Sequence, residues 1–159
     1  MKNSLKVLAA SASFLALAST VQADQLSYAG GWPPGSGPTG ALENYAAAVE
    51  ENSNGEVTMR VYPLSLLSFA ESNAGVRDGL ADMSAILTPY FSAEFPTLNM
   101  ISEFSEMVEL AEFSGELSSL AFAGAVSEFV TLNCPQCQTE VAAQKQCYMG
   151  AGMTTSYVL

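Results

Sequence analysis

The chain has 159 residues, a formal net charge of −11 and no histidine. So acidic a surface repels nucleic acid and anionic lipid, and neither is an expected partner. Without histidine and without a G-x-S-x-G motif the chain lacks the machinery of a serine hydrolase. Its three cysteines, with no histidine beside them, do not make up a zinc site.

Residues 1–23 have the pattern of a secretory signal peptide. Lys2 and Lys6 supply the positive start, residues 7–17 form a short apolar core, and residues 21–23 (V-Q-A) form a small-x-small cleavage site. The apolar run is too short to span a bilayer. We therefore expect cleavage, a periplasmic location, and no direct membrane insertion of the mature chain.

The first part of the mature chain alternates strand and helix patterns, which is typical of an α/β fold with parallel strands. In one strand pattern Val57, Met59 and Val61 alternate with polar or amphipathic residues, and Pro63 ends the run. The predicted strands cover residues 25–29, 57–63 and 81–87, and the predicted helices cover residues 40–52 and 69–78.

Short polar motifs mark the ends of these two helices. Thr39 or Ser36 caps the first helix, and the Asn-Gly pair at residues 54–55 provides its left-handed stop. Ser68 and Glu71 form a capping box that opens the second helix.

A loop rich in Gly and Pro follows the first predicted strand, at residues 30–38. It contains Trp32, the only tryptophan, and lacks the glycine spacing of phosphate-binding loops. A tryptophan at such a place either stacks on a ligand or covers the core. The residues alone leave both readings open.

The later part of the chain is mainly helical. A helical pattern over residues 105–132 is weakened or divided by Gly115 and Gly124. Its glutamates recur opposite an apolar face, which favours a solvent-facing stripe over acid–base chemistry. A further helix over residues 138–145 precedes a predicted strand at residues 147–150. The chain stops within a strand-like run, from which we expect a truncated chain.

Several short motifs follow one another in order. They are Trp32-Pro33-Pro34, Asn54-Gly55, the V-x-M-x-V-x-P strand at residues 57–63, Val76-Arg77-Asp78-Gly79-Leu80-Ala81-Asp82-Met83, Pro89-Tyr90, Phe95-Pro96, Cys134-Pro135-Gln136-Cys137 and Tyr148-Met149-Gly150. In this order they resemble TRAP transporter substrate-binding proteins of the dicarboxylate (DctP) type. The resemblance is close through Pro96 and looser beyond it.

This resemblance implies an α/β, periplasmic-binding-protein-like (type II) two-lobe clamp, of which mainly the first lobe is present. The first lobe would cover residues 24–146, and residues 147–159 would form a crossing strand and the start of the second lobe. The implied function is capture of a small organic anion, which in the family is usually a carboxylate, and its delivery to an ion-gradient-driven TRAP membrane permease. The resemblance implies neither enzymatic activity nor a cofactor.

The ligand contacts that the resemblance implies come from two loops. Trp32 lies in the loop after the first strand, and Leu87, Thr88 and Tyr90 lie in the loop after the third. In the family an arginine of the second lobe usually pairs with the ligand carboxylate, because its planar fork matches two oxygens. No arginine follows Arg77, so we expect weak or absent binding by this chain.

The pair Cys134-x-x-Cys137 has three readings. An exported chain favours a structural disulfide, a thioredoxin-like redox pair is an alternative, and a metal site lacks further ligands. Cys147 is left over. Two functions therefore stand beside solute capture: an exported thiol-disulfide redox protein that uses this pair, and the ligand-sensing domain of a signalling receptor.

Overall fold

A computed structural model describes residues 24–110 and 116–152 of the chain. The predicted signal peptide (residues 1–23), residues 111–115 of the long helical pattern and residues 153–159 lie outside the described residues. No helix within the described ranges is long and apolar enough to cross a membrane.

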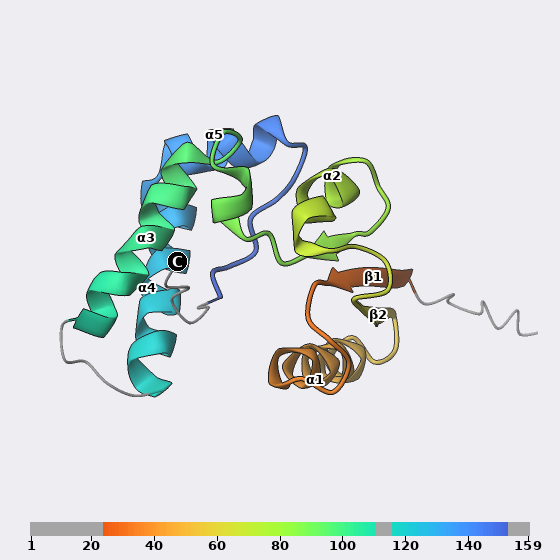
Figure 1. Ribbon diagram of the computed structural model, residues 1–159. Coiled ribbons are helices and arrows are strands. Elements are labelled where there is room, and N and C mark those ends of the chain that lie inside the picture. The colour runs from red at the N-terminus through yellow and green to blue at the C-terminus, as the bar shows by residue number, and fades with distance from the viewer. Residues whose placement is uncertain (1–23, 111–115, 153–159) are drawn as a thin grey trace, which may run out of the picture.

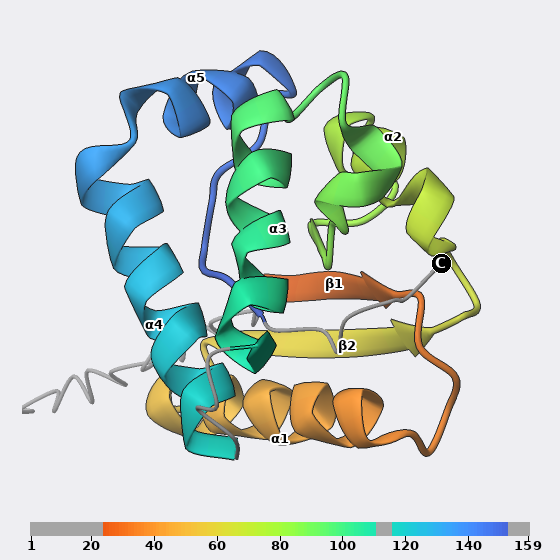
Figure 2. The same ribbon diagram turned by 60° about the vertical axis from the view of Figure 1, so that its left-hand side comes forward.

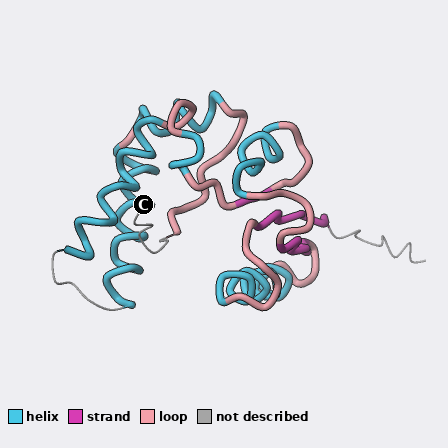
Figure 3. Tube along the Cα trace, viewed as in Figure 1, coloured by secondary structure: helices cyan, strands magenta, loops and turns pink. Residues whose placement is uncertain are grey.

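The sheet has three parallel strands in the order β2-β1-β3 (Figures 1 and 3). Strand β1 (Asp24–Gly30) pairs along its whole length with β2 (Val57–Pro63), with Asp24 opposite Val57 and Gly30 opposite Pro63. The short β3 (Met83–Ser84) pairs with β1 on its other side. The expected α/β fold with parallel strands is thus confirmed.

Helix α1 (Gly37–Asn52) joins β1 to β2 and lies next to β2 (Figure 2). Of the two predicted caps, Ser36 is the N-cap, and its Oγ accepts a hydrogen bond from the Thr39 N–H at 3.4 Å. The hydroxyl of Thr39 instead donates to the Pro33 carbonyl at 2.9 Å. The chain leaves α1 through the predicted left-handed residues at 54–55, with φ values of 52° and 79°.

The second predicted helix is two short pieces, the 3₁₀ turn η1 (Phe69–Glu71) and α2 (Ser72–Arg77). The Glu71 carboxylate accepts hydrogen bonds from the Ser68 N–H at 3.0 Å and from the Ser68 hydroxyl at 2.6 Å. This pairing agrees with the predicted capping motif. Helix α2 lies against β3, at the opposite edge of the sheet from α1.

The third strand is much shorter than predicted, because only residues 83–84 of the expected 81–87 pair with β1. Side chains fix this short strand. The Asp82 carboxylate accepts from the Ser27 N–H and hydroxyl, both at 2.7 Å, and the Ser84 hydroxyl donates to the Ala29 carbonyl at 2.7 Å. Beyond Ser84 the chain leaves the sheet for the 3₁₀ turn η2 (Thr88–Phe91).

Three helices form the other half of the molecule: α3 (Pro96–Leu110), α4 (Glu116–Asn133) and α5 (Pro135–Ala143). Figure 2 shows α3 and α4 side by side and running in opposite directions, with α5 across one end of the pair. Helix α3 begins well before the predicted start at residue 105. Its first turn is capped by Glu140 from α5, which no local pattern reveals.

The larger apolar core lies in this helical half, and a smaller one includes a residue of β1. The buried residues of the larger core come from η2, the turn after it and all three helices; they are Phe91, Phe95, Leu98, Val130, Cys134, Cys137 and Val141. The smaller core consists of Ala29, Leu67 and Ala81.

The segment after α5 ties the two halves together. The buried Asn73 of α2 donates from Nδ2 to Gln144 Oε1 at 3.3 Å, and Gln146 Nε2 donates to Asn73 Oδ1 at 2.9 Å. Farther on, the Ala151 N–H donates to the Ser127 hydroxyl of α4 at 2.8 Å. The predicted strand over residues 147–150 is wrong as a strand, because residues 146–152 have no ladder pairing and are held by side chains instead.

Candidate functional site

The candidate site lies at the carboxyl edge of the sheet, where the connections of β1 and β3 diverge. The register sets Ser84, the last residue of β3, opposite Ala29 of β1, so both strands end at the same edge. From there the chain after β1 passes to α1 on the β2 side, and the chain after β3 passes to η2 on the other side. In a parallel α/β sheet such a divergence leaves a crevice in which ligands bind.

Trp32 lies two residues after β1 and is half-buried. Its ring meets the Phe69 ring edge-on, with centroids 5.0 Å apart and an interplanar angle of 84°. Phe69 also touches the backbone of Gly31, where an added Cβ would lie 2.5 Å from Phe69 Cγ. Only glycine therefore allows this close approach, which fixes the course of the loop that carries Trp32.

Thr88 opens η2 and is linked to α3. Its Oγ1 lies 3.0 Å from the Ser102 hydroxyl, which itself donates to the Asn99 carbonyl at 2.7 Å. Because Ser102 has a single hydroxyl proton, Thr88 is the donor in the first bond. The Thr88 oxygen therefore keeps lone pairs that can accept, while its proton is already used.

Leu87 and Tyr90 complete the second loop. Leu87 is half-buried with extended backbone, and its carbonyl accepts from the Tyr90 N–H at 3.0 Å. The Tyr90 side chain is 60% exposed and its ring lies 6.4 Å from that of Phe91. Tyr90 is thus the member of this loop most open to a partner from solvent.

Sequence reasoning missed Asn99, one turn before Ser102 on the same side of α3. Its Oδ1 atom is buried and has no hydrogen-bond donor among the described residues. Leaving a buried acceptor unsatisfied costs about 1–3 kcal/mol. No sequence pattern singles out this amide, since its significance comes from burial and from its neighbour Ser102.

The two loops carry no positive charge. The Lys and Arg residues within the described ranges are Arg60, Arg77 and Lys145. Arg60 is on β2 and lies over the Tyr62 ring at 4.9 Å, whereas Arg77 pairs with Asp78 at 3.0 Å. Burial raises the pKa of Tyr28, at the end of β1, to about 12, so its hydroxyl is neutral. The described wall of the site thus offers shape, an aromatic face and hydrogen bonding, but no cation.

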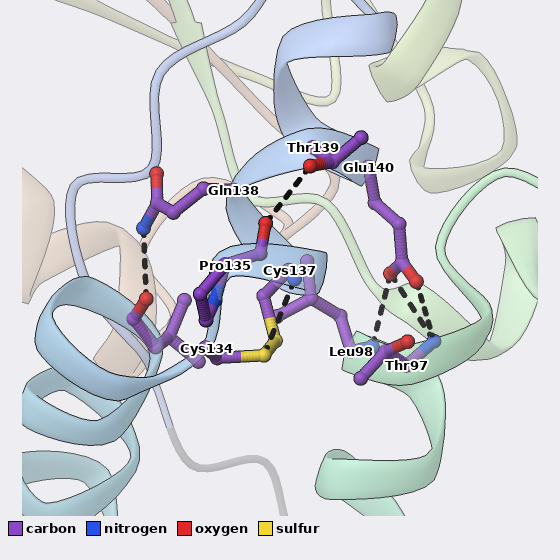
Figure 4. The surroundings of a disulfide bond; sticks show 9 residues. Thr97, Leu98, Cys134, Pro135, Cys137, Gln138, Thr139 and Glu140 are labelled. Carbon is purple, nitrogen blue, oxygen red and sulfur yellow. Dashed lines mark hydrogen bonds between the residues drawn. A yellow bond between two sulfur atoms is a disulfide. The ribbon is translucent and has the colours of Figure 1, made fainter.

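The cysteine pair lies apart from this edge, at the start of α5 (Figure 4). Cys134 and Cys137 are joined by a disulfide with a Cα–Cα distance of 5.3 Å, and the Cys134 sulfur accepts from the Cys137 N–H at 3.2 Å. Cys134 is 6% exposed and Cys137 is fully buried, both in the larger core. Cys147 is a free, exposed thiol. The disulfide was one of the three readings of the sequence motif.

Comparison with known proteins gives a likeness to solute-binding proteins over part of the chain. No protein-family model matches the sequence, and no curated protein matches it either. Among solved structures, it is similar to a TRAP periplasmic solute-binding protein from Desulfovibrio salexigens, with 28% identity and a TM-score of 0.47 over 51% of this chain. It is also similar to a TRAP periplasmic solute-binding protein from Rhodobacter sphaeroides, with 18% identity and a TM-score of 0.49 over 74% of this chain.

The chain spans 26% and 36% of the lengths of these two proteins. Since neither TM-score reaches 0.5, support for a function comes from the sequence motifs and from the loops at the sheet edge.

Proposed function

We propose that this chain is the first lobe of a periplasmic solute-binding protein of the TRAP type, similar to the dicarboxylate (DctP) group. It captures a small organic carboxylate and presents it to an ion-gradient-driven membrane permease. The observation that carries this proposal is the pairing of two loops. The motifs that resemble the family, at Trp32 and at Leu87–Tyr90, follow two neighbouring parallel strands at one edge of the sheet.

These loops suit a small organic ligand. Trp32 supplies a half-buried aromatic ring, Thr88 supplies acceptor lone pairs, and Tyr90 supplies a largely exposed phenol side chain. Ligand sites in proteins are mostly apolar, with few polar groups that fix orientation. A hydroxyl or amide of the ligand can donate to the Thr88 oxygen.

The carboxylate of the ligand has no cationic partner in these two loops. A carboxylate is held best by an arginine fork, and the two described arginines, Arg60 and Arg77, are engaged with Tyr62 and Asp78. We therefore infer that this chain binds organic acids in the millimolar range, with Kd near 1 mM corresponding to about −4 kcal/mol. The stronger contact of the family would belong to a second lobe.

The redox alternative is less well supported. An enzyme that exchanges disulfides presents an accessible, low-pKa sulfur to its substrate. Here Cys137 is fully buried and Cys134 nearly so. This burial favours a structural disulfide. The sensor alternative uses the same ligand loops and differs only in the membrane partner.

Calorimetric titration with small mono- and dicarboxylates tests the proposal. We expect Tyr90→Ala and Thr88→Val to weaken binding at least threefold, because each removes a polar group at the sheet edge. Tyr45→Ala is the matched control, since Tyr45 is 47% exposed on helix α1 and belongs to neither ligand loop. Equal affinities for Tyr90→Ala and Tyr45→Ala would count against the site.

A further inference from the structure

A second candidate surface is an apolar groove on the helical half, away from the sheet edge. It lies between α3 and α4 and has a volume of about 390 Å³. We call it the α3–α4 groove. Its main walls are Met100, Ile101 and Phe104 from α3 and Phe122, Val126 and Phe129 from α4.

The groove is apolar and open to solvent. Met100 is 58% exposed, Phe104 50% and Phe129 46%. Large apolar side chains gathered at one exposed place mark an interaction surface more often than scattered ones do. Thr97 is the one polar lining residue, and its N–H is already used by Glu140. The groove thus lacks the polar groups that orient a small molecule.

The charge around the groove indicates the kind of partner. No lysine or arginine occurs between Asp78 and Gln144, a stretch that includes both helices of the groove. Each helix also carries an exposed glutamate next in sequence to a phenylalanine of the groove, Glu103 before Phe104 on α3 and Glu128 before Phe129 on α4. A second copy would bring an equally acidic face, and an anionic membrane would be repelled. A partner with apolar side chains and positive charges is complementary.

We propose that the α3–α4 groove is a docking site for a basic amphipathic helix of another polypeptide. Such a helix lays its apolar face between two helices of its receptor, with anchors at positions i, i+3, i+4 and i+7. Helix α3 has 15 residues and α4 has 18. At a rise of 1.5 Å per residue, a helix of roughly 12–15 residues matches this length. Lysine or arginine on its flanks would lie near Glu103 and Glu128.

The probe is a synthetic, fluorescein-labelled helical peptide of about 14 residues with Leu on one face and Lys on the other. Anisotropy with the full chain measures its affinity at low and at high salt. Two control peptides are used: one with the same composition in scrambled order, and one with Glu in place of Lys. The Leu/Lys peptide should bind at least tenfold more tightly than either, and its affinity should fall as salt is raised.

Variants of the chain test whether the peptide binds in the α3–α4 groove. Phe129→Asp and Met100→Asp should each weaken binding about tenfold or more, since each puts a charge into the apolar wall. Leu80→Asp is the matched control, because Leu80 is 63% exposed beyond α2 and outside the groove. The double change Glu103→Gln and Glu128→Gln should weaken binding about threefold to tenfold, whereas Glu50→Gln and Glu51→Gln on α1 should not.

Three results would overturn the proposal. The first is equal loss of affinity in Phe129→Asp and Leu80→Asp. The second is binding of the Leu/Glu peptide as tight as that of the Leu/Lys peptide. The third is a dimer of the chain in sedimentation that Phe129→Asp abolishes, which would assign the groove to a second copy. The surface Glu→Gln variants keep the test decisive if an aspartate variant fails to fold.

Discussion

The cap that Glu140 provides for α3 is the clearest long-range interaction in the fold, and its removal gives a quantitative prediction. Glu140 is 6% exposed, and its carboxylate accepts from the Thr97 N–H at 2.9 and 3.1 Å and from the Leu98 N–H at 3.2 Å (Figure 4). These N–H groups belong to the first turn of α3, which has no intrahelical acceptors for them. The side chain is thus an N-cap supplied from another helix.

The cost of losing this cap follows from its bonds. Glu140→Ala leaves two N–H groups of a partly buried turn without an acceptor and removes a negative charge from a helix N-terminus. At about 1–3 kcal/mol for each unsatisfied donor, offset in part by water, we expect a loss of about 2–4 kcal/mol. Glu140→Gln keeps one acceptor oxygen and should lose about 1–2 kcal/mol.

The pH dependence of stability gives an independent readout. Burial raises the pKa of the Glu140 carboxyl, but hydrogen bonds from Thr97 and Leu98 outweigh this effect and hold the pKa below its usual value. The stabilisation is therefore complete above the unfolded pKa of about 4.3 and is lost as pH falls through the lower folded value. The difference in stability between wild type and Glu140→Gln should shrink over that interval.

Urea denaturation at a series of pH values measures both effects. Glu128→Gln is the matched control, because Glu128 is an exposed glutamate on α4, and it should change stability by less than about 0.5 kcal/mol. The reasoning is refuted if Glu140→Gln is as stable as Glu128→Gln at pH 7. It is also refuted if the deficit of Glu140→Gln is the same at pH 7 and at pH 3.

Three further predictions concern the sheet edge and the disulfide. Hydrogen bonds from Ser27 hold the pKa of Asp82 below its usual value, so Asp82→Asn should lower stability by about 0.5–1 kcal/mol above pH 4, with the loss vanishing in acid. Gly31→Ala should cost about 1–3 kcal/mol, because its Cβ would overlap the ring that packs against Trp32. Replacing Cys134 and Cys137 by Ala should cost about 2 kcal/mol, the entropy of so short a loop. Urea denaturation measures all three.

Each of these changes has its own comparison. Gly40→Ala should not destabilise, since nothing lies within 4 Å of a Cβ built there. Cys147→Ala should leave stability unchanged, because Cys147 is exposed and free. A Gly31→Ala variant as stable as Gly40→Ala would contradict the packing argument. If the double cysteine variant is as stable as the wild type, a stabilising role of the disulfide is contradicted. If the loss of stability in Asp82→Asn does not change with pH, a role for the Asp82 charge is contradicted.

The elements that the sequence predicts well are those fixed by neighbours in the chain. Alternation defines β2, and local caps at Ser36 and Ser68 define the starts of the helices that follow β1 and β2. The elements predicted poorly depend on distant partners. Strand β3 is set by side-chain bonds from Asp82 to Ser27, 55 residues away, and α3 starts early because Glu140 caps it from 43 residues away.

The same contrast holds for the candidate site. Its position follows from the succession of strands and helices, since parallel strands bring their following loops to one edge. The contacts that its side chains make cannot be predicted from this succession. The Trp32 ring packs against the Phe69 ring, and the Thr88 hydroxyl donates a hydrogen bond to Ser102, 14 residues away in the sequence. Such contacts depend on tertiary packing, as does the burial that leaves Asn99 Oδ1 without a donor.

Fluorescence of Trp32 during titration with small organic acids tests the central claim most directly. Trp32 is the only tryptophan in the chain, so its emission reports on the candidate site alone. The account predicts a saturable change with small organic carboxylates at millimolar concentrations. Submicromolar binding would contradict the claim that this wall lacks an anion anchor. No change up to tens of millimolar would contradict the placement of the ligand at the sheet edge.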